Sequence, residues 1–161
     1  MERGPVITDS AREFADGFPD GGALLAIDLG TKTLGTATCD AGWQFATAGK
    51  TLPRGKFGRD RDAFAALILE RSVKGLVIGL PRNMDGSEGP RAQASRAYAR
   101  NLAEAFGLPV LLWDERWSTA SAKSAMIGQD FSRRKRAMRI DSHAAAVFLQ
   151  GAIDAMAGGV I

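Results

Sequence analysis

Three acidic residues lie at the expected ends of secondary-structure elements. Asp28 ends a short apolar segment, Glu115 follows a later one, and Asp141 opens the expected last helix. The ends of adjacent strands converge in space, and carboxylate oxygens from such positions suit Mg²⁺ or Mn²⁺. Two such ions about 4 Å apart can activate a water molecule and stabilise the leaving oxygen of a phosphodiester. The alternative is that each acid only caps a helix or pairs with a nearby base, because the 18 acids of the chain offer many accidental triples.

Other metal-binding residue types are scarce. The chain has one cysteine, Cys39, and one histidine, His143. A single cysteine forms no internal disulfide, and a single histidine completes no Cys/His zinc cluster. His143 lies two residues after Asp141, about 200° further round an ideal helix, so we expect it on the helix surface. Any metal ion must therefore be held by oxygen ligands.

The turn after Asp28 is a candidate phosphate contact. It contains Gly30, Thr31 and Lys32. Backbone N–H groups of a tight glycine turn, together with a lysine, can approach a phosphate. An ordinary hairpin with a solvated lysine accounts for the same residues.

Two further residues could line the same groove. Asn83 follows Pro81 in a glycine-containing turn, where turn formation alone explains its presence equally well. Arg116 could hold Glu115 in position or contact a phosphate, and a structural ion pair is the competing interpretation.

A basic run precedes Asp141 and is expected in the loop between the last two helices. Five positive charges fall within seven residues: Arg133, Arg134, Lys135, Arg136 and Arg139. Charge runs are usually only solvated. Immediately before a candidate catalytic acid, however, this run favours contact with nucleic-acid phosphates.

The apolar pattern predicts the elements that would position these residues. Three strands come first, at 23–28, 34–39 and 45–51, with a turn at 40–42. Helices at 59–71 and 90–106 then alternate with strands at 76–80 and 110–113. A helix at 118–127 and a last helix from 141 or 142 follow. This order predicts an α/β fold with a mixed five-stranded sheet flanked by helices.

Length and composition set the remaining bounds. At 161 residues the chain has the size of one domain, and we expect that domain to span residues 23–161. Residues 1–22 hold five acids and two arginines, a net −3, so the total of +3 leaves +6 for the rest. We expect this first segment to be a poorly ordered extension. No apolar run approaches the roughly 20 residues of a membrane span, and the acidic start is unlike a signal peptide, so a cytoplasmic protein is expected.

Three sequence blocks resemble the YqgF/RuvX family: IDLGTKTLG at 27–35, VIGLPRNMDGSE at 77–88 and WDERWST at 113–119. The resemblance covers about residues 23–156. It implies a ribonuclease-H-like three-layer fold and a pre-16S ribosomal RNA nuclease, a family earlier described as Holliday-junction resolvases. It also implies that Asp28, Glu115 and Asp141 are the catalytic acids. Trp117 departs from the aliphatic residue usual in the family, and residues 1–22 extend beyond its usual start.

Several functions stay open at this point. The first expectation is metal-dependent hydrolysis of precursor ribosomal RNA during 5′-end maturation, by a monomer or homodimer. The alternatives are a resolvase acting on branched DNA and a non-catalytic RNA-binding factor in ribosome assembly. An actin-like ATPase or sugar kinase is disfavoured, because it needs two domains and a second phosphate loop.

Overall fold

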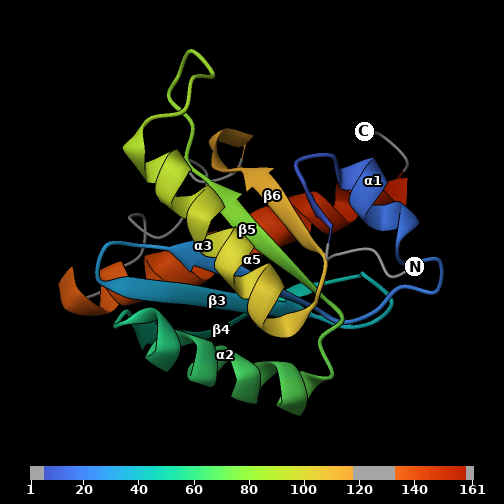
Figure 1. Ribbon diagram of the computed structural model, residues 1–161, viewed down its shortest axis with the longest axis horizontal. Helices are drawn as coiled ribbons and strands as arrows, with labels where there is room; N and C mark the ends of the chain where they lie inside the picture. Colours follow the sequence, from blue (N-terminus) through green and yellow to red (C-terminus); the bar gives the residue numbers. More distant parts are fainter. Residues whose placement is uncertain (1–5, 118–132, 159–161) are drawn as a thin grey trace.

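The computed structural model describes residues 6–117 and 133–158, and it describes side chains for residues 6–116 and 142–156. The strands are β1 (Ile7–Thr8), β2 (Leu24–Leu29), β3 (Thr33–Cys39), β4 (Ala46–Pro53), β5 (Gly75–Leu80) and β6 (Val110–Asp114). The helices are α1 (Ala11–Asp16), α2 (Phe57–Arg71), α3 (Pro90–Phe106), the 3₁₀ turn η1 (Glu115–Trp117) and α5 (Arg133–Gly158). Figure 1 shows these elements around a single sheet.

The strands form one mixed sheet in the order β1-β6-β5-β2-β3-β4. β2, β5, β6 and β1 run parallel, whereas β3 and β4 continue from β2 as an antiparallel meander. Parallel strands are covered on both faces and therefore consist of continuous apolar runs. β5 fits this rule, since all six of its residues are buried.

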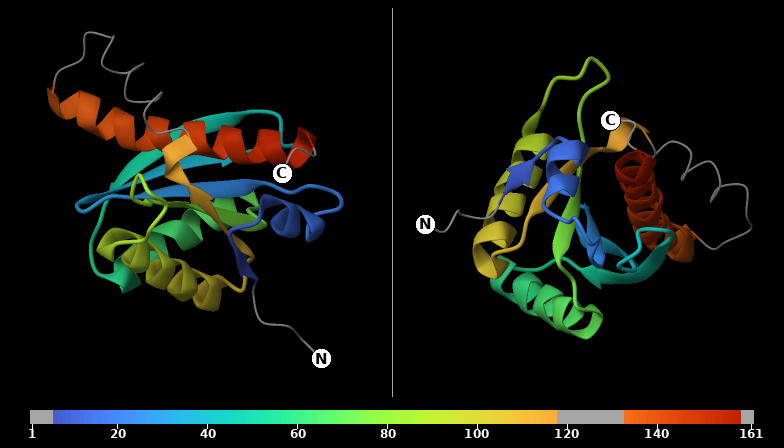
Figure 2. Two further views of the ribbon diagram at one scale, coloured as in Figure 1. Left: turned by 90° about the horizontal axis from the view of Figure 1, so that it is seen from above. Right: turned by 90° about the vertical axis from the view of Figure 1, so that its right-hand side faces the viewer.

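Helices cover both faces of the sheet, α5 on one and α2 with α3 on the other (Figure 2). The core under α2 and α3 contains Ile27, Phe64 and Leu102. The core under α5 contains Ala26 and Phe148. Alternate residues of β2 therefore point to different layers, as the period of a strand requires.

The predicted α/β architecture is confirmed, but the predicted count of five strands is wrong. The sheet has a sixth strand, because β1 pairs in parallel with the edge strand β6. The predicted helix at 90–106 has the bounds of α3, which begins at Pro90 and ends before Gly107 in a left-handed conformation (φ 65°). Proline in the first turn and glycine after the last are the usual helix boundaries. The predicted helix at 118–127 lies outside the described residues.

The prediction of a poorly ordered segment is wrong for residues 7–16. Helix α1 starts at the N-cap Ser10, whose hydroxyl accepts a hydrogen bond from the Glu13 N–H at 3.2 Å. Ser-x-x-Glu is the capping-box pattern, so this helix start was readable from the sequence. Phe14 is 2% exposed and belongs to the core under α5, which explains why so short a helix is held in place.

The last helix begins earlier than predicted. α5 runs from Arg133, not from residue 141 or 142, so the basic run lies within the helix and not in a loop. No glycine or proline occurs between residues 133 and 150, and arginine, lysine, alanine and methionine are good helix formers. Asp141 is therefore an interior residue of α5 and does not cap it. Within the described ranges, no helix combines the length and apolar character that a membrane span requires.

Candidate active site

Asp28 lies near the end of β2, on the face of the sheet that α5 covers. It alternates with Leu24 and Ala26, which pack in the core under α5, and it is half-buried. Across the antiparallel pair it lies opposite Gly35 of β3, and Gly35 in turn lies opposite Thr51 of β4. The carboxylate therefore stands in a row that crosses three strands.

Glu115 packs against the neighbouring strand. A Cβ on Gly79 of β5 would lie 2.8 Å from Cγ and 2.9 Å from Cδ of Glu115, so this side chain occupies the space that a larger residue would need. Ile27 and Ile78 are partners in the β2–β5 ladder, which brings Asp28 beside Gly79 one residue further on. Gly79 shares its face with Val77 of the core under α5. Asp28 and Glu115 thus lie on the same face, over adjacent strands.

Helix α5 crosses this row at the residue after Asp141. The hydroxyls of Ser142 and Thr51 share a short hydrogen bond, and Thr51 belongs to the row of Asp28. Ser142 is 5% exposed, so α5 is seated firmly on the sheet here. The side chain of Asp141 lies outside the described set, and within that set no three metal-binding side chains form a cluster.

Arg116 pairs with Asp114, not with Glu115. Its Nε and Nη2 atoms donate to the Asp114 carboxylate at 3.0 and 2.7 Å, and its backbone N–H donates to the same group at 3.0 Å. Burial alone would raise the pKa of Asp114, but these hydrogen bonds and the charges of Arg116 and Arg82 lower it below its ordinary value. A structural ion pair, the interpretation that competed with the two functional roles of Arg116, is therefore present. It holds the turn that carries Glu115.

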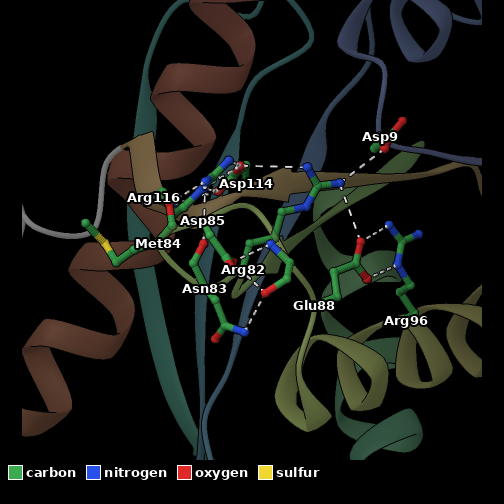
Figure 3. A network of polar contacts seen from close by, with 10 residues as sticks. Asp9, Arg82, Asn83, Met84, Asp85, Glu88, Arg96, Asp114 and Arg116 are labelled. Carbon is green, nitrogen blue, oxygen red and sulfur yellow. Dashed lines mark hydrogen bonds and ion pairs between the residues drawn. The ribbon is translucent and has the colours of Figure 1, made fainter.

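The loop between β5 and α3 is held by the same arginine (Figure 3). Nη1 of Arg116 donates to the carbonyl oxygens of Asn83 and Met84 at 3.4 and 3.3 Å. Asn83 is exposed and donates through Nδ2 to the Ser87 hydroxyl at 3.0 Å. This hydrogen bond stabilises the turn, which is the role that the sequence offered as the alternative to a groove contact. Met84 at the tip is 93% exposed.

Arg82 connects the N-terminal segment to this loop. Its Nη2 lies 3.4 Å from Asp9 and 3.6 Å from Glu88, and its Nη1 lies 4.0 Å from Asp114. Glu88 also accepts two hydrogen bonds from Arg96, at 2.6 and 2.7 Å. The Arg96 hydrogen bonds are the main cause of the lowered pKa of Glu88. Sequence reasoning did not identify Asp9, Arg82 or Asp114 as parts of one network.

The other predicted site residues are placed as follows. Thr31 and Lys32 are exposed in the turn after β2, where the Gly30 N–H donates to the Thr33 carbonyl at 2.9 Å. The basic run occupies the first two turns of α5, and its side chains lie outside the described set: Arg133, Arg134, Lys135, Arg136 and Arg139. His143 is half-buried, one residue beyond Ser142.

The one cysteine lies away from this site. Burial raises the pKa of Cys39 to about 11. Cys39 is the ladder partner of Leu24, at the far end of the β2–β3 pair from Asp28.

Comparison with known proteins identifies the family. The family model described as "RuvX: Holliday junction resolvase" matches residues 22–155. The chain belongs to the RuvX family. A relative from Novosphingobium aromaticivorans, named "Putative pre-16S rRNA nuclease", is 63% identical over 95% of this chain and 98% of its own length. A relative of the same name from Sphingopyxis alaskensis is 61% identical over 94% of this chain and 99% of its own.

A solved structure supports the fold. Thermus thermophilus RuvC in complex with a Holliday-junction substrate superposes with a TM-score of 0.55, covering 85% of this chain and 96% of its own. The sequences are 14% identical, so this likeness concerns the fold alone. The ribonuclease-H-like fold expected from the resemblance is thereby confirmed.

Proposed function

We propose that this RuvX-family chain is a metal-dependent nuclease that hydrolyses a phosphodiester bond in the precursor of 16S ribosomal RNA. The observation that carries the proposal is the placement of Asp28 and Glu115 over adjacent strands, under the stretch of α5 that contains Asp141. Both side chains are carboxylates, and carboxylate oxygens that share one face of a sheet suit a hard divalent cation. A site that binds cations accounts for both.

The residues present fit a divalent metal ion. Asp28 and Glu115 supply oxygen ligands, and Gly79 has no Cβ where the Glu115 side chain lies. Asp141 would supply the third carboxylate from α5. Cys39 is excluded as a ligand for two reasons. Burial raises its pKa to about 11, so the thiol stays protonated at neutral pH. It also lies opposite Leu24, which is four residues along β2 from Asp28, about 13 Å at the rise of a strand. Bound Mg²⁺ or Mn²⁺ would activate a water molecule and stabilise the leaving oxygen of the phosphodiester.

The remaining residues have two roles in this proposal. Arg116 positions the turn that carries Glu115, because it binds Asp114 on one side and the 83–84 carbonyls on the other. Thr31, Lys32, Asn83 and the basic run, which α5 carries before Asp141, would contact phosphates of the substrate. Lysine and arginine contacts to phosphates release counterions and so contribute sequence-independent affinity.

The substrate class follows from the relatives, whose names refer to pre-16S ribosomal RNA. Branched DNA is the second candidate, and the family description as a Holliday-junction resolvase favours it. Binding without cleavage is the third outcome to be tested.

One experiment separates these functions. Purified protein would be incubated with Mn²⁺ and with precursor 16S RNA, a four-way DNA junction or linear duplexes, and the same reactions would be run with a chelator. The proposal predicts cleavage of the precursor RNA only when the metal is present. Cleavage confined to the four-way junction would assign the chain to DNA, and binding without cleavage of any substrate would contradict a nuclease.

A further inference from the structure

A basic hollow lies on the α3 side of the turn that follows Asp28. It has a volume of about 200 Å³ and is bordered by Leu29 to Thr31, by Arg54 and by the first two turns of α3. Two arginines, Arg54 and Arg91, line it, and no acidic residue does. Leu29 packs in the core under α3, whereas Asp28 faces α5. The hollow and the candidate active site therefore lie on the two sides of one turn.

Arg54 is fixed in the hollow, and none of the side chains that the structure describes gives it a carboxylate partner within 4 Å. Its Nη1 donates to the Gly30 carbonyl at 2.7 Å, and its backbone N–H donates to the Lys32 carbonyl at 2.9 Å. Its guanidinium carbon lies 5.5 Å from the centre of the Tyr98 ring, a cation–π arrangement. These contacts orient the planar group but do not neutralise it.

The acid beneath Tyr98 is already engaged. Asp60 is 2% exposed, and its two oxygens accept hydrogen bonds from the Tyr98 hydroxyl and the Gly55 N–H, each at 2.9 Å. Burial, together with the hydrogen bond to Asp60, raises the pKa of Tyr98, so this hydroxyl remains a donor at all ordinary pH values. Asp60 therefore anchors the ring on which Arg54 stacks.

Arg91 adds a second uncompensated charge. It is exposed in the first turn of α3, and that turn contains no acidic residue. Among the described residues, no carboxylate oxygen lies within 4 Å of a nitrogen of Arg54 or Arg91. A cation at a helix N-terminus opposes the helix dipole, whereas an anion there is stabilised. Arg91 is thus placed where a bound anion would improve its electrostatic environment, and Arg54 lines the same hollow.

We propose that Arg54 and Arg91 bind a backbone phosphate of the nucleic-acid substrate, a few nucleotides from the bond that is cut. This inference rests on the proposed function, because the ligand is the same nucleic acid. A nucleic-acid strand that crosses this end of the sheet would pass from the Asp28 side of the turn to the hollow. Guanidinium groups suit this task, since they present paired N–H donors to phosphate oxygens.

The test compares Arg91→Ala with Arg100→Ala, which removes an exposed arginine from the same helix outside the hollow. Binding of a labelled RNA containing the 5′ boundary of 16S RNA would be measured by fluorescence anisotropy at several salt concentrations with a chelator, so that cleavage does not enter. We expect Arg91→Ala to lower the log–log salt slope by about 0.7 to 0.9, the value of one phosphate contact. Arg100→Ala should leave the slope at the wild-type value. Arg54→Gln, checked for folding by its melting temperature, should lower the slope in the same way as Arg91→Ala.

The outcomes distinguish this site from the proposed function. Equal slopes for wild type, Arg91→Ala and Arg54→Gln would overturn the phosphate site, even if the wild-type protein cleaves RNA. Equal losses in Arg91→Ala and Arg100→Ala would also overturn it, because they would indicate a diffuse charge effect. A lowered slope in Arg91→Ala alone of that pair supports the site whether or not metal-dependent cleavage is found.

Discussion

Replacing Gly79 by alanine tests the position of Glu115 without altering any acid. The added Cβ would lie 2.8 Å from Cγ and 2.9 Å from Cδ of Glu115, which is closer than van der Waals contact allows, so one of the two residues must shift. Because Glu115 lies beyond the end of β6 and is only half-buried, its side chain can move away more easily than the strand. We therefore expect the carboxylate to move by about 1 Å, a displacement that can reduce catalysis by about 100-fold. That factor corresponds to about 2.7 kcal/mol in the activation free energy.

Stability should change much less than activity in this variant. Alanine restricts the unfolded chain, a gain of about 0.4 to 1 kcal/mol, whereas overpacking costs about 1 to 3 kcal/mol where a neighbour cannot move. The assay pairs metal-dependent RNA cleavage with thermal unfolding. Gly58→Ala is the matched control, since its added Cβ would meet nothing closer than an arginine side-chain nitrogen at 4.0 Å. If Gly79→Ala cleaves within a few-fold of wild type at the same metal concentration, the contact between Gly79 and Glu115 is not needed for activity.

Three further predictions follow from other parts of the molecule. Phe14→Ala should destabilise the fold by about 3 to 5 kcal/mol, because Phe14 is 2% exposed in the core under α5; an unchanged melting temperature would show that helix α1 contributes nothing. Neutralising Arg133, Arg134, Lys135 and Arg136 together should flatten the salt dependence of RNA binding by about 0.7 to 0.9 per lost contact, and an unchanged slope would leave the run as a solvated helix face. Asp114→Asn should destabilise the protein at neutral pH. The folded-state pKa of Asp114 lies below its ordinary value of 3.8. The ionised carboxylate therefore stabilises the folded protein above pH 3.8, and this stabilisation is lost as the pH falls through the folded-state pKa. A destabilisation by Asp114→Asn that is the same at pH 7 and pH 3 would contradict the ion pair.

The elements that follow simple periodic patterns were predictable from the sequence. β5 is a continuous apolar run, and α3 has proline in its first turn and glycine after its last. Asp28 could be proposed as a site residue because it follows such an apolar run. These features depend on residues that are close together in the chain.

The contacts that complete the site depend on pairing between distant segments. The contact between Gly79 and Glu115 requires the register of β5 with β6, which no local pattern specifies. The partner of Arg116 depends on a 3₁₀ turn that brings Asp114 within reach. Arg54 could not be singled out from the sequence, because its placement depends on stacking over Tyr98, which belongs to another element.

The N-terminal segment shows a different limit. Its capping box, Ser10 to Glu13, was present in the sequence, but six helical residues are too few to be stable alone. Their stability comes from Phe14, which is buried against the α5 side of the sheet. The start of α5 was placed too late because Asp141 is a residue type that favours helix N-caps, whereas here the helix continues through it.

The most direct test of the account is metal-dependent cleavage of precursor 16S RNA by wild type and by Asp28→Asn, Glu115→Gln and Asp141→Asn. Each substitution removes one negative charge at nearly constant volume, so each variant should fold, with a melting temperature and circular dichroism close to those of wild type. The account predicts that wild type cleaves with Mn²⁺ or Mg²⁺ and that all three folded variants are inactive. Cleavage by any one of them within a few-fold of the wild-type rate would contradict the assignment of that acid to the metal site.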